Sequence, residues 1–185
     1  MILKIIPIIA ILLSLLAAPA VERDIPGGPL VSNKEPGYPV RLVIPSIDVD
    51  ADILHLGLAE DGSIGAPPTP SDVAWFNLGP KPGTPGSSII TGHFGPWRIG
   101  VGSVFDKLHK LKEGDKVYVK DGEGNLLSFT VQGSRTYNPQ DPAPEIFHKE
   151  DDNSYLNLIT CNGDWVESKK TYTERLVIFT IKDDF

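Results

Sequence analysis

Proline and glycine are frequent along this chain, and they constrain its fold more than any other feature. There are 17 prolines and 18 glycines among 185 residues. Both residue types disfavour the interior of a helix, so long helices are not expected where they recur. Residues 61–86 are the densest part, with Pro67-Pro68, Pro82-Gly83 and Pro85-Gly86. The pattern predicts many short elements joined by turns, which favours an all-β fold over a helical bundle.

Between these turns lie seven or eight short apolar or alternating runs that read as strands. They cover residues 40–44, 51–56, 73–76, 88–91, 116–120, 126–131, 155–161 and 175–181. Apolar residues at three- and four-residue spacing predict one short amphipathic helix over 104–111, ended by Gly114-Asp115. A set of this kind suits a closed or nearly closed barrel, in which loops between strands carry the function.

The N-terminus differs from the rest of the chain. Residues 1–20 are apolar except for the cation Lys4 and the hydroxyl of Ser14, and about 20 such residues can span a bilayer. Ala18-Pro19-Ala20 also fits the cleavage site of a signal peptide. We favour an uncleaved membrane anchor with Lys4 on the cytoplasmic side. Residues 21–38 then form a Pro/Gly-rich linker, and residues 39–185 an extracytoplasmic domain, which is secreted if the signal is cleaved.

Composition supports one globular domain and argues against one class of partner. Hydrophobic residues make up 41% of the chain and charged residues 22%, which is normal for a globular protein. The net charge is −7, with no basic run. Because nucleic-acid binding needs clustered Lys and Arg, we expect no nucleic-acid partner.

Cys161 is the only cysteine of the chain. Exported proteins usually carry cysteines in pairs, so an unpaired one is either a small buried hydrophobe or a reactive thiol. His93 and Arg175 also stand at the ends of predicted strands. A histidine can exchange a proton with a thiol or a substrate near neutral pH, and an arginine can hold a developing oxyanion. Strands joined by one loop carry Cys161 and Arg175, so the two residues can face each other.

Several stretches together resemble the sortases, cysteine transpeptidases of the bacterial cell surface. The three signature stretches are Thr91-Gly92-His93, Leu158-Ile159-Thr160-Cys161 and Glu174-Arg175-Leu176-Val177-Ile178. Further segments resemble the family in the same order, and the loop pattern is most similar to the smaller classes D, E and F. The resemblance implies a closed eight-stranded sortase-type β-barrel with one or two short helices.

The same resemblance implies an activity and roles. Cys161 would attack a sorting signal of Leu-Pro-x-Thr-Gly type between Thr and Gly, and an amine of the cell wall or of a pilin would release the thioester. His93 would move the protons, and Arg175 would bind the carbonyl oxygen. Thr160, Trp97 and Trp165 are candidates for substrate binding. The resemblance calls for no cofactor, and no metal site is expected.

Two alternatives stay open from the sequence. One is another envelope enzyme, an L,D-transpeptidase, although Asn162-Gly163-Asp164 after Cys161 departs from the usual core of that family. The other is a non-catalytic surface β-barrel with a buried cysteine.

Overall fold

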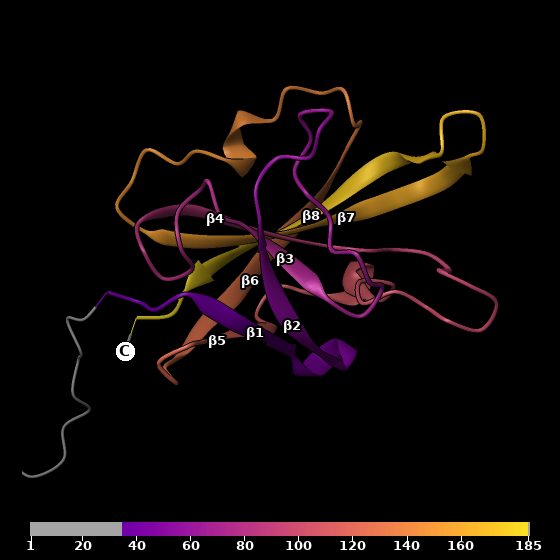
Figure 1. Cartoon of the computed structure of the whole chain (residues 1–185). Coiled ribbons are helices and arrows are strands. Elements are labelled where there is room, and N and C mark those ends of the chain that lie inside the picture. The colour runs from indigo at the N-terminus through magenta and orange to yellow at the C-terminus, as the bar shows by residue number, and fades with distance from the viewer. Residues whose placement is uncertain (1–34, 185) are drawn as a thin grey trace, which may run out of the picture. The chain divides into compact units, whose positions relative to one another are not determined.

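The structure, a computed structural model, describes residues 35–184, which form a closed barrel of eight strands (Figure 1). In space the strands follow the order β1-β2-β3-β4-β7-β8-β6-β5. Their bounds are β1 Pro39–Ile44, β2 Val49–Leu56, β3 Val73–Phe76, β4 Gly86–Gly92, β5 Lys116–Asp121, β6 Leu126–Tyr137, β7 Ser154–Val166 and β8 Thr171–Lys182. The all-β prediction and the eight-stranded barrel are therefore confirmed.

The predicted helix over 104–111 is wrong in type. The described residues contain only three short 3-10 helices, η1 Pro45–Ile47, η2 Leu108–Lys110 and η3 Pro144–Ile146. Around η2 the backbone amides bond three residues back, with Leu108 N to Phe105 O at 3.0 Å and Leu111 N to Leu108 O at 3.1 Å. A 3-10 helix repeats every three residues, so Phe105, Leu108 and Leu111 are all buried without an α-helix.

The interior of the barrel is filled by alternate residues of its strands, because successive side chains of a strand point to opposite faces. Along β2, for example, Val49, Ala51 and Ile53 are buried and the residues between them are exposed. The 3-10 segment contributes Phe105 and Leu108 to the same core. This continuous core gives the strand ends a rigid base on which a site can be built.

The pairing of β7 sets one rim of the barrel. It runs parallel to β4, and their last pair is Thr91 with Ile159. On the other side β7 is antiparallel to β8, and the pairing of β8 with β6 ends at Tyr137 and Arg175. Beyond this level β7 and β8 pair only with each other, and together they extend away from the barrel as a hairpin (Figure 1). The strands predicted over 155–161 and 175–181 stop short of this hairpin, so both strands are longer than predicted.

The anchor predicted over 1–20 and most of the linker predicted over 21–38 lie outside the described residues. Within residues 35–184 no helix has the length and apolar character needed to cross a bilayer. The linker and anchor therefore stay predictions from the sequence.

Asp183 fastens the end of the chain to the barrel, which leads to a first prediction. Its carboxylate accepts hydrogen bonds from the Ser128 and Thr130 hydroxyls and pairs with Lys116 Nζ at 2.8 Å. Burial alone would raise the pKa of Asp183, but these three partners outweigh it and lower the pKa to about 2. We expect Asp183→Asn to lower the free energy of unfolding by about 1–2 kcal/mol at neutral pH. This figure is smaller than the full energy equivalent of the pKa shift, because solvent screens the partly exposed Lys116.

The pH dependence tests the cause. A carboxyl group with a lowered pKa stabilises the fold above its unfolded value of 3.8, and this stabilisation disappears as the pH falls to about 2. Denaturant unfolding of wild type and variant should therefore converge over that window. The matched control is Asp184→Asn at the exposed neighbouring position, which should change little. Equal stabilities of wild type and Asp183→Asn at pH 7 would contradict the prediction.

Candidate active site

Cys161 and Arg175 lie directly opposite each other on β7 and β8. Both lie within strands rather than at strand ends, but they stand at the rim, where the neighbouring strands β4 and β6 stop pairing. The Cys161 side chain is half-buried. Burial raises the pKa of the thiol above its ordinary value, and the charge of Arg175 partly counters this. At neutral pH the thiol is therefore mainly protonated, and the nucleophilic thiolate is a minor form.

His93 follows directly after the last residue of β4 and is held from two sides. Its Nε2 lies 2.7 Å from the carbonyl oxygen of Pro67, and the backbone amide of Phe105 donates to the carbonyl of His93 at 3.0 Å. A carbonyl oxygen only accepts, so Nε2 carries a hydrogen and donates it. The assignment leaves Nδ1 as the ring nitrogen that is free to exchange a proton with a substrate.

Thr160 connects the two reactive segments. Its side chain is buried, and its hydroxyl donates to the carbonyl oxygen of Gly92 at 2.8 Å. This bond joins the residue before Cys161 to the residue before His93. Glycine at position 92 also lets the Phe105 ring pack against this strand end, because a Cβ there would lie 2.6 Å from that ring. The geometry assigns Thr160 a positioning role inside the protein, whereas the contact with substrate predicted from the sequence remains a prediction.

One cavity contains both reactive side chains. It has a volume of about 620 Å³, and its wall comes from two segments, residues 93–103 after β4 and residues 161–172 of the β7–β8 hairpin. Both Cys161 and His93 line it. No hydrogen bond joins them in the part of the chain that the structure describes. The size lies within the range of small-molecule pockets, about 300–1,000 Å³.

The two predicted tryptophans also line this cavity. The Trp97 ring lies 4.8 Å from the His93 ring, centroid to centroid, and Trp165 donates from Nε1 to Glu167 at 2.7 Å. Their exposed fractions are 41% and 50%. Large, partly exposed rings beside a reactive thiol are suited to packing against a peptide, and their role in binding stays a prediction.

The Arg175 guanidinium makes three hydrogen bonds within the protein. Its Nη1 donates to the backbone carbonyls of Tyr172 at 3.2 Å and Glu174 at 2.9 Å, and its Nη2 donates to the Thr171 hydroxyl at 3.1 Å. Arg175 is not among the residues that line the cavity. Much of its hydrogen-bonding capacity therefore holds the start of β8 in shape.

Tyr172 is a lining residue that the sequence reading missed. It lies on β8 opposite Trp165, ahead of the strand predicted over 175–181. Its ring contacts Phe94 and Trp165, at centroid distances of 5.4 Å and 5.2 Å. The available signal was the run Thr171-Tyr172-Thr173, which has the residue types of a strand.

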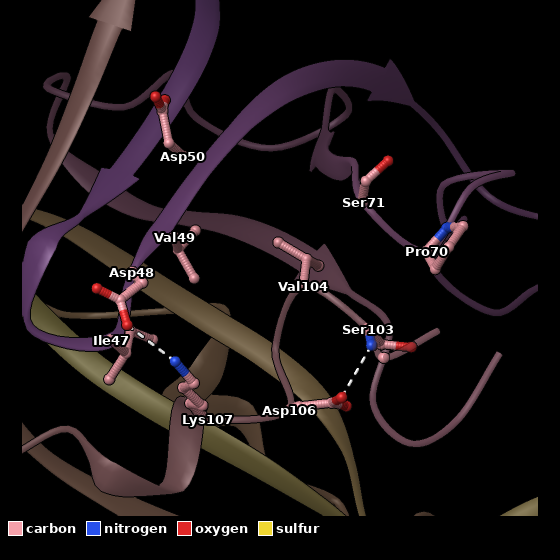
Figure 2. Close-up of a pocket in the computed structure, with 11 residues that line it drawn as sticks. Ile47, Asp48, Val49, Asp50, Pro70, Ser71, Ser103, Val104, Asp106 and Lys107 are labelled. Carbon is pink, nitrogen blue, oxygen red and sulfur yellow. Dashed lines mark hydrogen bonds and ion pairs between the residues drawn. The ribbon is translucent and has the colours of Figure 1, made fainter. Parts of the chain in front are cut away.

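The loop after His93 is held in shape by Asp106. This carboxylate accepts the backbone amides of Gly95 at 2.7 Å and Ser103 at 2.8 Å. Figure 2 shows the second of these bonds at the edge of a separate cavity of about 360 Å³, where Lys107 is also paired with Asp48. That cavity contains neither a thiol nor an imidazole. Among residues 35–184 no three His, Cys, Asp or Glu side chains are grouped as a metal site would need.

Comparison with known proteins places this geometry in a family. The family model described as "Sortase domain" matches residues 42–182. The fold is similar to crystal structures of sortase C-1 from Actinomyces oris (26% identity, 79% of this chain and 72% of that chain, TM-score 0.61) and of sortase C1 from Streptococcus suis (21%, 80% and 74%, 0.62). It is also similar to a lid mutant of sortase A from Corynebacterium diphtheriae (24%, 83% and 74%, 0.61). No curated protein matches the sequence.

Proposed function

Because this chain belongs to the sortase family, and is therefore a cysteine transpeptidase, we propose that it cleaves a Leu-Pro-x-Thr-Gly-type sorting signal between Thr and Gly. The observation that carries the proposal is the single cavity lined by both Cys161 and His93. Membership of the family sets aside the non-catalytic barrel and the L,D-transpeptidase. Classes D, E and F remain a prediction about the subclass.

In the first step the Cys161 thiolate adds to the carbonyl carbon of the threonine. The carbon–nitrogen bond to glycine breaks, and protonated His93 gives its proton to the leaving amine. The products are a thioester on Cys161 and a peptide that begins with glycine. Since burial raises the pKa of the thiol, only a small fraction of the enzyme is in the thiolate form, and slow turnover is expected.

In the second step an amine attacks the thioester. His93 takes the proton of the amine, a new amide bond forms, and the Cys161 sulfur leaves as the thiolate. The acceptor would be an amine of the cell wall or of a pilin subunit. The two Arg175 N–H groups without a partner in the described part of the chain would hold charge on the carbonyl oxygen. The apolar segment 1–20 supports a place at the outer face of the membrane.

A peptide assay tests this function directly. The full-length chain is incubated with a Leu-Pro-x-Thr-Gly peptide library, with and without an added amine such as triglycine. We expect an acyl adduct on Cys161 by mass spectrometry, cleavage between Thr and Gly, and a new amide product only when the amine is present. Cleavage at a different bond, or hydrolysis of every peptide without acyl transfer, would contradict the proposed substrate and reaction.

A further inference from the structure

The Tyr172 side chain spans the cavity wall between the two segments that form the site. Its ring packs edge-on against Phe94 on one side and Trp165 on the other. The hydroxyl lies directly over the Cα of Gly95, because a Cβ built there would be 1.9 Å from the Tyr172 oxygen. Gly95 also has φ +87°, a conformation that favours glycine. Packing on three sides therefore fixes the position of the phenol.

The Tyr172 hydroxyl is fixed in place but has no hydrogen-bond partner among residues 35–184. The fully buried side-chain polar atoms that lack a partner belong to Ser87, Ser88 and Asn157, so the Tyr172 oxygen keeps some exposure to solvent. It lies against Gly95, and both residues line the cavity. Burial raises the pKa of the phenol above its ordinary value, and the charges of Cys161 and Asp106 raise it further. The hydroxyl therefore stays protonated over the working pH range and can act as a hydrogen-bond donor.

Three of the Arg175 N–H groups are engaged within the protein, which leaves room for a second donor at the site. A guanidinium has five N–H groups, and three of its hydrogen bonds go to Tyr172 O, Glu174 O and Thr171 Oγ1. One of these bonds holds the backbone of Tyr172 itself. Arg175 thus supports Tyr172, which lines the cavity, although Arg175 itself is not a lining residue.

We propose that Tyr172 is a further catalytic residue, whose hydroxyl donates a hydrogen bond to the oxygen of the carbonyl that Cys161 attacks. The proposal rests on the acyl transfer proposed above. As the thiolate adds to the carbonyl carbon, the electron pair of the C=O bond moves to the oxygen. The hydroxyl stabilises that charge without giving up its proton, and the charge returns to the carbonyl when the amine leaves.

The test is Tyr172→Phe, which keeps the ring contacts and removes the oxygen. We expect kcat to fall by about 10- to 100-fold with KM little changed, since a neutral donor beside a cation contributes less than a sole oxyanion donor. Alkylation of Cys161 by iodoacetamide forms no acyl oxyanion, so its rate should be unchanged. The matched control is Tyr155→Phe on the same strand pair, where the lost hydroxyl bonds Asp151 and full activity is expected.

A second variant covers the case in which Tyr172→Phe folds poorly. With 3,5-difluorotyrosine at position 172 the ring is retained but the phenol ionises at a lower pH. We expect kcat to fall as that phenol loses its proton, at a pH where the wild type stays active. Unchanged kcat in both variants, a change in KM alone, or equally slowed alkylation would each overturn the catalytic role. A wild type that cleaves no sorting peptide would instead refute the function proposed above.

Discussion

Cys161→Ala should abolish both cleavage and acyl transfer, because no other thiol exists in the chain to form the acyl-enzyme. The fold should be preserved, since Cys161 is only half-buried at the barrel rim and one sulfur atom is a small loss of packing. Peptide turnover followed by mass spectrometry, together with a thermal melt, measures both outcomes. If the alanine variant turned over the peptide at the wild-type rate, covalent catalysis by this residue would be excluded.

The pH dependence of thiol alkylation gives an independent check on Cys161. Its raised pKa means that the thiolate, and with it the alkylation rate, should still be increasing above the ordinary thiol value of 9.0. For Cys161→Ala, the matched control is Ser88→Ala on β4, at a buried position whose hydroxyl has no partner in the described residues. That variant loses one buried atom of similar size and should keep its activity. An alkylation rate that reaches its plateau below pH 7 would contradict the raised pKa.

His93→Ala should reduce peptide turnover by about 100- to 10,000-fold, the usual contribution of a general acid–base group. The imidazole has to protonate the leaving amine and then take a proton from the incoming one, so both halves of the reaction should slow. Single-turnover measurement of acylation and, separately, of aminolysis distinguishes the two effects. If either step keeps its wild-type rate, His93 does not move the proton in that step.

Two further variants separate proton transfer from structure. His93→Gln retains an N–H donor that can reach the Pro67 carbonyl but cannot exchange a proton, so it should be as inactive as the alanine variant. His55 offers a matched control, because its Nε2 also lies 2.7 Å from a backbone carbonyl, that of Pro39, on the opposite side of β3 from β4. His55→Gln should remain active. Recovery of activity in His93→Gln would show that the hydrogen bond to Pro67, rather than proton transfer, is what the reaction needs.

The sequence contained enough local information to predict the barrel. Alternating burial along β2 and β5 follows directly from alternating residue types, and the turn residues mark where each strand stops. The identity of the reactive groups also came from sequence, since a lone cysteine in Leu-Ile-Thr-Cys and a histidine in Thr-Gly-His are properties of the chain itself. The roles of these groups remain predictions for the experiments above.

Elements whose form depends on pairing or packing with another segment were not predictable in the same way. The 104–111 segment has a spacing that fits both an α-helix and a 3-10 turn, and only its packing onto the barrel core selects the 3-10 form. The β7–β8 hairpin extends past the barrel because Trp165 pairs with Tyr172, and neither residue alone indicates a strand partner.

The sequence by itself therefore determined the fold class and the chemical groups, because strand alternation, turn residues and a single thiol are local features. Only the tertiary structure decided how those groups meet. A hydrogen bond from Thr160 to Gly92 brings β7 beside His93, and packing against Phe94 carries Tyr172 into the same cavity. Each of these contacts joins residues distant in sequence, so they stabilise the protein only once the barrel has closed.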